Sequence, residues 1–267
     1  MHIHFLDPYQ LRHSPLHRLD PRLKFVLALA FILTAALTPS GAWPVYILLF
    51  ALVFSVTVLS DLGAAYVLKR SALALPFVLS ALPVIFTTQG APLVSFTLGG
   101  WTLTVFQPGL VRIASIALKS WISVQAAILL AASTPFPDLL MAMRAVGVPR
   151  LIVAVIGLMW RYLFVLADEA LRLIRARLAR SGDTGNPELR KGGSLVWRGR
   201  VTGGMAGNLF LRAFERSDRI YMAMLSRGYD GEVRALPLPP LSPLHWIILG
   251  AGLSTLALLL TFAFLIG

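Results

Sequence analysis

The sequence predicts an all-α integral membrane protein with about five transmembrane helices and a cytoplasmic helical domain. Of its 267 residues, 57% are hydrophobic and only 13% are charged, and the mean hydropathy is +0.76. A soluble domain carries about 25% charged residues, so the composition indicates a polytopic membrane protein. Several apolar segments have about the length of 20 residues that crosses a bilayer, and the charged residues gather between them.

The predicted spans cover about residues 24–38, 43–60, 71–87, 110–133 and 244–267. The third contains Pro76 and Pro83, so we expect it to bend, which neighbouring helices in a bundle can accommodate. After it, residues 92–106 alternate polar and apolar side chains around Gly99-Gly100, and this alternation predicts a small hairpin.

The charge distribution predicts that the N-terminus lies inside and the C-terminus outside. In that orientation the outer loops are about 39–42 and 88–109, and neither contains an acidic or basic residue. All 12 acidic residues and all but two of the 24 lysines and arginines then lie on the inner side; the exceptions, Arg112 and Lys119, lie in the fourth span. Lysine and arginine accumulate on the cytoplasmic side of membrane proteins. The net charge of +12 therefore needs no nucleic acid as a partner, and we expect a multi-pass protein of the inner (plasma) membrane.

Residues 134–239 are expected to form the cytoplasmic domain, between an N-terminal part with four spans (1–133) and a part with the last span (240–267). A sixth span over residues 151–167 is the alternative, because its length just allows a crossing. It would place Arg161 in hydrocarbon, at a cost of about 2.5–3.5 kcal/mol on insertion scales, and would export the arginines that follow it. We therefore expect this segment to be a helix packed under the membrane.

Two long helices are expected in this domain, over about residues 151–180 and 208–227. The loop between them, 181–203, is rich in glycine and polar residues. Asn208 is the expected N-cap of the second helix, and Gly228 is the expected residue just after its end.

Both long helices are expected to end in an arginine between small residues. The two triplets are Ala179-Arg180-Ser181 and Ser226-Arg227-Gly228. One interpretation is that each arginine only complements the negative end of its own helix, for a few tenths of a kcal/mol. The other is that an arginine on an uncrowded helix tip plugs an acidic groove of a partner, because its planar guanidinium offers five donors to carboxylates. The pattern alone leaves the two interpretations level.

The chain resembles the T components of energy-coupling-factor (ECF) transporters, in particular the CbiQ-like group of metal importers. The resemblance is based on SPLHRLDPRLK (14–24), TPFPDLLMAMRAVGVPRL (134–151), the two arginine triplets and RGYDG (227–231). It implies a transmembrane scaffold whose two coupling helices insert their tip arginines into grooves on two ABC-type ATPase subunits. It also implies a membrane-embedded S component, here CbiM-like, that captures the substrate, with cobalt or nickel as the cargo.

By position, Arg180 and Arg227 resemble the tip arginines of this family, and Ala179, Ser181, Ser226 and Gly228 resemble their small neighbours. The first triplet has serine where the family pattern has glycine, which weakens the expectation of a left-handed cap at residue 181. The implied surface for the S component is formed by Phe210, Phe214, Met222 and Met224, although the domain could use the same side chains as its own core.

We expect a non-catalytic subunit with no cofactor. The chain contains no G-x-x-x-x-G-K-[ST] sequence, in line with ATP hydrolysis by partner subunits. An ordinary ABC-importer permease is the alternative, but only Glu169-Ala170-Leu171 begins the usual coupling-loop pattern and no matching glycine and proline follow. A membrane-embedded lipid-modifying enzyme would need clustered acidic residues, and Asp230 and Glu232 stand without a third nearby.

No metal site is predicted. The chain has no cysteine, and His2, His4, His13 and His17 are interpreted as ordinary solvent-facing histidines. Lys119 inside the fourth span is a functional candidate by position, but a lysine paired within the bundle is the commoner case.

Overall fold

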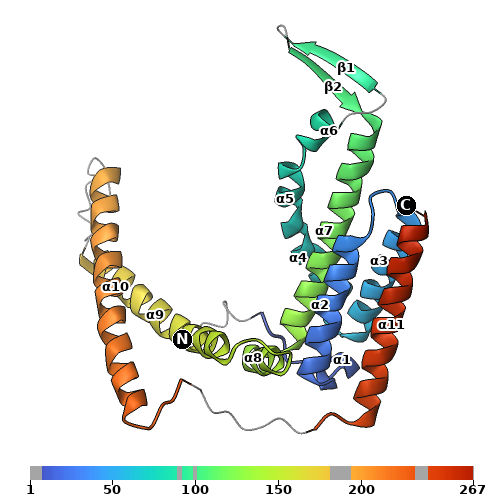
Figure 1. Cartoon of the computed structure of the whole chain (residues 1–267). Coiled ribbons are helices and arrows are strands. Elements are labelled where there is room, and N and C mark those ends of the chain that lie inside the picture. The colour runs from blue at the N-terminus through green and yellow to red at the C-terminus, as the bar shows by residue number, and fades with distance from the viewer. Residues whose placement is uncertain (1–7, 89–91, 99–100, 181–193, 232–239, 267) are drawn as a thin grey trace. The chain divides into compact units, whose positions relative to one another are not determined.

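The computed structural model describes residues 8–88, 92–98, 101–180, 194–231 and 240–266. Its contacts divide the chain into two compact units. One, which we call the bundle, is built on residues 8–147 and 238–267, and the other, which we call the helix pair, is built on residues 148–237 (Figure 1). The change of unit thus falls after Gly147.

The long helices of the bundle are α2 (Pro21–Leu37), α3 (Trp43–Leu59), α7 (Gln107–Ser133) and α11 (Pro243–Ile266). The shorter elements are α1 (Pro15–Arg18), α4 (Ala64–Ser71), η1 (Ala72–Ala74), α5 (Leu75–Ser80), α6 (Val84–Thr87) and α8 (Phe136–Ala145). By length and composition, α7, α11 and the segment Ala64–Thr87 can cross a membrane, and α3 is a shorter apolar helix. The protein is an all-α membrane protein, and its described residues include a small hairpin.

The third predicted span is bent, as its two prolines predicted. Pro76 lies in the first turn of α5, and Pro83 directly precedes α6 after a turn. The hairpin is confirmed as well: β1 (Pro92–Leu98) pairs with β2 (Trp101–Phe106) in antiparallel register, with Leu98 opposite Trp101.

The core of the bundle lies where one face of α3 meets α2, α7 and α11. The inner face of α3 repeats every three or four residues and includes Val45, Leu49 and Val53, each at most 3% exposed. Phe31 of α2 and Ile122 of α7 belong to the same core cluster. The outward side chains of these helices are apolar too, as is usual for helices that face hydrocarbon.

Two lysines tie helix ends together inside the bundle. Lys119 of α7 donates hydrogen bonds to the backbone carbonyl oxygens of Thr38 and Ala36, the latter at 3.5 Å. The last carbonyl groups of a helix lack partners within it, so Lys119 satisfies the C-terminal end of α2. At the other end of α2, Lys24 is only 6% exposed and donates to the carbonyl oxygen of Ser133, at the end of α7, over 3.0 Å. Both lysines have structural partners.

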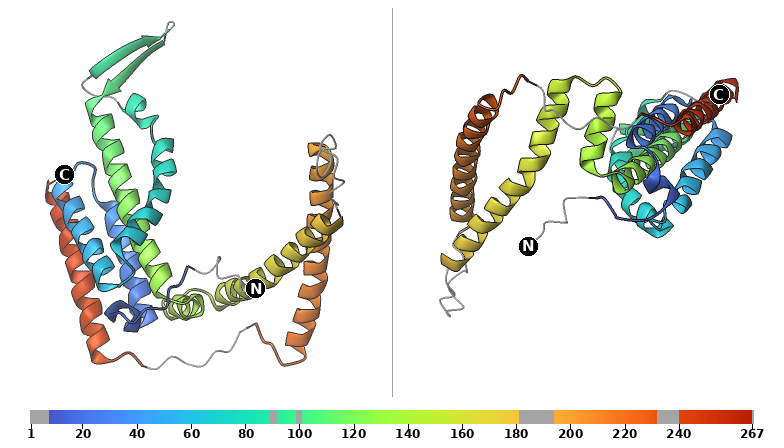
Figure 2. Two further views of the ribbon diagram at one scale, coloured as in Figure 1. Left: turned by 180° about the vertical axis from the view of Figure 1, so that it is seen from behind. Right: turned by 90° about the horizontal axis from the view of Figure 1, so that it is seen from below.

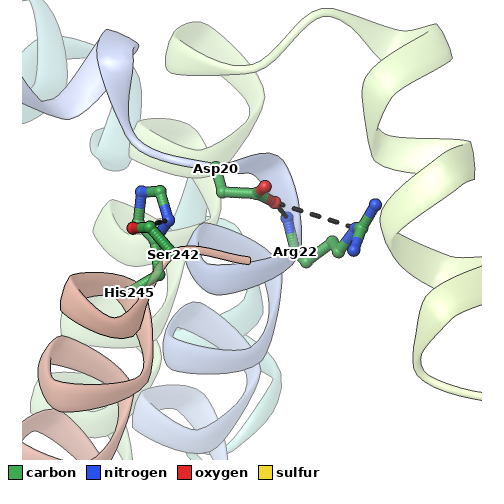
Figure 3. Close-up of polar contacts among 4 residues, drawn as sticks. All are labelled: Asp20, Arg22, Ser242 and His245. Carbon is green, nitrogen blue, oxygen red and sulfur yellow. Dashed lines mark hydrogen bonds and ion pairs between the residues drawn. The ribbon is translucent and has the colours of Figure 1, made fainter. Parts of the chain in front are cut away.

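Helices α2 and α11 begin side by side. In Figure 3 the Asp20 carboxylate accepts a 2.9 Å bond from the Arg22 backbone N–H, and Ser242 Oγ lies 2.9 Å from His245 Nδ1. A proline follows both Asp20 and Ser242 and is the first residue of each helix. A backbone N–H at this position would have no acceptor within the helix, so proline loses nothing there. Both helices therefore run in the same direction, with the hairpin at the opposite end of the bundle (Figures 1 and 2).

The helix pair consists of α9 (Arg150–Arg180) and α10 (Leu195–Leu225), which run antiparallel. Within these two helices, both described over their full length, Ala154 of α9 is the one buried residue. By length and composition α9 is also able to cross a membrane. A sixth span over residues 151–167 therefore stays an alternative by these two criteria.

The expected start of the second long helix is wrong. α10 begins at Leu195 rather than near Asn208, and its N-cap is Ser194, whose Oγ accepts a 3.2 Å bond from the Trp197 backbone N–H. Residues 195–203 of the predicted loop are therefore helical, while 181–193 lie outside the described residues. The glycines of this stretch lower helix propensity, but contacts with α9 and the serine cap outweigh that preference.

Candidate functional site

The tip of α10 is fixed by two backbone hydrogen bonds that close its last turn. The Gly228 N–H donates to the Leu225 carbonyl oxygen over 2.9 Å, and the Tyr229 N–H donates to the Met224 carbonyl oxygen over 3.0 Å. These are the two bonds of a Schellman motif, with Gly228 in the left-handed conformation at φ 78°. The prediction that Gly228 directly follows the end of the helix is confirmed, and Arg227 is the last residue before the chain changes direction.

The side chains around Arg227 leave the tip uncrowded. Arg227 itself is exposed, and Ser226 Oγ turns back to donate to the Ala223 carbonyl oxygen over 3.0 Å. A Cβ atom placed on Gly228 would find no neighbour within 4 Å. The small residues beside Arg227 therefore leave room for a partner surface to approach its guanidinium closely.

The tip of α9 is described up to its arginine. Arg180 is the last residue of the helix, and both Arg180 and Ala179 are exposed. Ser181, the third member of this predicted triplet, lies outside the described residues. Within the helix pair, Arg180 and Arg227 mark opposite ends, because α9 and α10 run antiparallel.

A cluster of polar contacts holds α9 against α10. Both oxygens of the Glu169 carboxylate are used: Oε1 lies 3.4 Å from Arg212 Nη1, and Oε2 lies 3.5 Å from Arg216 Nη2. Nearer the Arg180 end, Arg177 donates to Thr202 Oγ1 over 2.8 Å and its guanidinium lies 5.9 Å from the Trp197 ring centre. Glu169, which begins the permease-like string, thus has a structural role within the pair.

Three of the four predicted partner-surface residues are well exposed. Phe210 is 69% exposed, Phe214 60% and Met222 66%, so they do not form an internal core of the helix pair. Met224 instead lines a groove of about 760 Å³ between the N-terminal half of α9 and the C-terminal end of α10. Exposed apolar and aromatic residues of both helices line the same groove, among them Val155, Met159 and Tyr221.

The four N-terminal histidines do not come together in the part of the chain that is described. His2 and His4 lie outside it, and His13 is exposed. The expectation that His17 faces solvent is wrong, because its ring is partly buried. Its Nε2 donates to the Gln10 carbonyl oxygen over 3.1 Å, and its Nδ1 lies 2.7 Å from Ser14 Oγ. Burial lowers the pKa of His17, and the bond to Gln10 offsets part of that effect. Among the described residues no three potential metal ligands cluster.

The comparisons with known proteins agree on one family. The model of the cobalt transport protein family, CbiQ, matches residues 12–237. The chain is 25% identical over 225 residues to the cobalt transport protein CbiQ of Salmonella typhimurium, which covers 79% of this chain and 91% of that protein. It is 29% identical over 228 residues to the energy-coupling factor transporter transmembrane protein EcfT of Exiguobacterium sibiricum, covering 82% of each. A putative fused cobalt transport protein, CbiMQ, of Methanocorpusculum labreanum is 25% identical over 241 residues, 88% of this chain and 38% of that protein.

Proposed function

We propose a role for the two helix tips that starts from the family of the chain. The chain belongs to the CbiQ cobalt transport protein family. It is a T component, the transmembrane component of an ECF-type transporter. It is a multi-pass protein of the plasma membrane and a transport subunit rather than an enzyme. Beyond this, we propose that Arg180 and Arg227 dock the chain onto two ABC-type ATPase subunits, one arginine on each.

The geometry of the Arg227 tip is the observation that carries the docking proposal. If the Arg227 guanidinium only interacted with the negative end of its own helix, open space at Gly228 would not be needed. The bond of the Ser226 hydroxyl to its own helix would not be needed either. The Schellman motif fixes the backbone that carries Arg227, so docking orders little more than one side chain. An arginine held in this way suits a groove lined by carboxylates.

Movement of the ATPases then reaches the membrane through the helix pair. ATP-driven closure of the two ATPases shifts both tips, and the Glu169 ion pairs make α9 and α10 respond together. The exposed Phe210, Phe214 and Met222 contact the S component and transmit the shift to it. An S component related to CbiM fits this role, because one relative is named as a fusion of CbiM with CbiQ. Cobalt is the proposed cargo, with nickel as the alternative, since relatives are named for cobalt transport.

Charge reversal at the tips tests the docking proposal. We expect Arg227→Glu to weaken recovery of the ATPases with the chain and to abolish uptake, because a close charge pair can contribute several kcal/mol to binding. Arg180→Glu should do the same at the second site, and the double variant should release both ATPases. Arg219→Glu, an exposed position on α10 away from the tip, is the matched control. Normal ATPase recovery with Arg227→Glu would return this arginine to the role of a helix cap.

Impermeant cysteine labelling tests the proposed orientation, because the native chain has no cysteine. Single cysteines at Gly99 and Gly267 should be labelled in intact cells, whereas Ser194→Cys should be labelled only after the membrane is opened. Labelling of Ser194→Cys from outside would place the start of α10 on the outer side and overturn the five-span topology.

A further inference from the structure

The bundle contains a cavity that the transport mechanism does not use. It measures about 480 Å³ and lies among α2, α3, α7 and α11, at the end of the bundle where α2 and α11 begin. Its lining is almost wholly apolar and includes Leu27, Phe31, Val56, Leu129 and Leu256. Most of this lining offers water no hydrogen-bond partner, so an apolar occupant suits most of the space.

Lys24 supplies the main polar group of the lining. Its ammonium group has three donors, and one of them is used by the Ser133 carbonyl oxygen at 3.0 Å. Asp20 and Asp138 attract its charge, but within the described part of the chain neither forms an ion pair with it. A cation such as the proposed cargo is repelled by Lys24, so an occupant must bring hydrogen-bond acceptors instead.

The length of the cavity matches part of one membrane leaflet. Lys24 and Phe31 are separated by seven residues of α2, which is about 10 Å of helix at 1.5 Å per residue. The hydrocarbon core of a bilayer is about 30 Å thick, or about 15 Å for each leaflet. The lining thus runs from a charged group at the membrane surface into the hydrocarbon region.

The cavity opens toward the membrane beside α11. Packing of α2 on α11 is tight at Gly252, where an added Cβ would lie 2.6 Å from Leu27 Cδ2, so this wall is closed. Ala251 and Thr255 of α11 also line the cavity, yet both are exposed. An acyl chain in the surrounding lipid can therefore reach the cavity from the side of these two residues.

We propose that the cavity binds one acyl chain of a phospholipid, with a headgroup oxygen accepting a hydrogen bond from Lys24. The apolar lining, the spare donors of a buried ammonium group at one end and the lateral opening together fit an amphiphile. The bound lipid fills the space between α3 and α11 and satisfies Lys24. This site lies apart from the tips and does not depend on the proposed ATPase docking.

Native mass spectrometry of the purified chain with added phosphatidylglycerol tests the site. Ala251→Phe and Thr255→Phe fill the cavity, and each should weaken binding of one phosphatidylglycerol at least tenfold. Ala257→Phe is the matched control, because Ala257 is exposed on the same helix and does not line the cavity. A thermal melt of each variant shows whether it is folded, and two filling positions keep the test valid if one variant is not. Wild-type affinity in a folded filling variant would overturn the proposal.

The contact with Lys24 has its own test. Diacylglycerol carries the same acyl chains without a phosphate, so the wild-type chain should bind phosphatidylglycerol at least tenfold more tightly than diacylglycerol. Lys24→Met should remove most of this preference for phosphatidylglycerol. Loss of the bond to Ser133 alone would not change the preference, because that bond does not involve the lipid. An unchanged preference in Lys24→Met would refute headgroup recognition by this lysine.

Discussion

The bundle encloses a packed apolar core, whereas the helix pair buries almost nothing between its two helices. In the bundle, Leu49 and Ile122 are at most 1% exposed, and long-range hydrogen bonds from Lys24 and Lys119 tie helix ends together. Along the described lengths of α9 and α10 only Ala154 is buried, and the contacts between the helices include the Glu169 ion pairs and the bond from Arg177 to Thr202. Large exposed apolar surfaces mark interaction sites, so we expect the helix pair to depend on contacts outside itself more than the core of the bundle does.

The largest contrast is expected from truncating one apolar side chain in each unit. Ile122→Ala should lower the free energy of unfolding by about 2–5 kcal/mol, because it opens a cavity in a packed core. Phe214→Ala should change the stability of the isolated chain by no more than about 0.5 kcal/mol, since this ring is 60% exposed. Thermal or denaturant unfolding in detergent measures both. Equal losses would contradict the difference between the units.

A smaller effect is expected at the ion pairs of the helix pair. Glu169→Gln removes the charge that faces both Arg212 and Arg216, and exposed ion pairs each contribute about 0.2–1 kcal/mol. The variant should therefore loosen α9 from α10, seen as faster hydrogen exchange in the pair and not in the bundle, and about 0.5 M salt should mimic it. Glu215→Gln, at an exposed position of α10, is the control. Equal exchange in wild type and Glu169→Gln would show that the Glu169 ion pairs do not hold the two helices together.

The smallest effect is expected from the titration of His17 under the bundle. Its pKa is lowered in the folded chain, chiefly by burial, so the unfolded chain binds the proton more readily. The stabilising contribution is complete above the ordinary pKa of 6.5 and is lost as the pH falls below that value. Melting temperatures measured from about pH 7.5 to about pH 5 should fall less in His17→Asn than in the wild type. The exposed His13, changed to Asn, should leave the wild-type pH dependence intact.

The spans and the C-terminal tip of α10 could be predicted because their signals are local. Continuous apolar runs predicted α2, α3, α7 and α11 to within a few residues, and two prolines predicted the bend before the hairpin. A glycine directly after an arginine predicted the left-handed residue at 228. Each of these features depends on side chains and backbone within one or two turns.

The features that could not be predicted depend on distant contacts. The start of α10 at Leu195 was missed, because four glycines in residues 199–207 suggested a loop and the support from α9 comes from another part of the chain. Lys119 finds its acceptors 81 and 83 residues away, and Lys24 finds its acceptor 109 residues away. No local pattern gives such partners, so the lysines could be recognised only as unusual in their positions.

The bond between Lys24 and Ser133 also sets an order of events during synthesis. A ribosome that adds about 5–20 residues per second needs roughly 5–20 s to make the 109 residues that separate them. For most of that interval α2 is complete, while the end of α7 that accepts the bond from its lysine has not been made. Lys24 must therefore remain hydrated at the membrane surface, with α2 held by its apolar length alone. Completion of α7 locks the base of the first span only after half of the chain has left the ribosome.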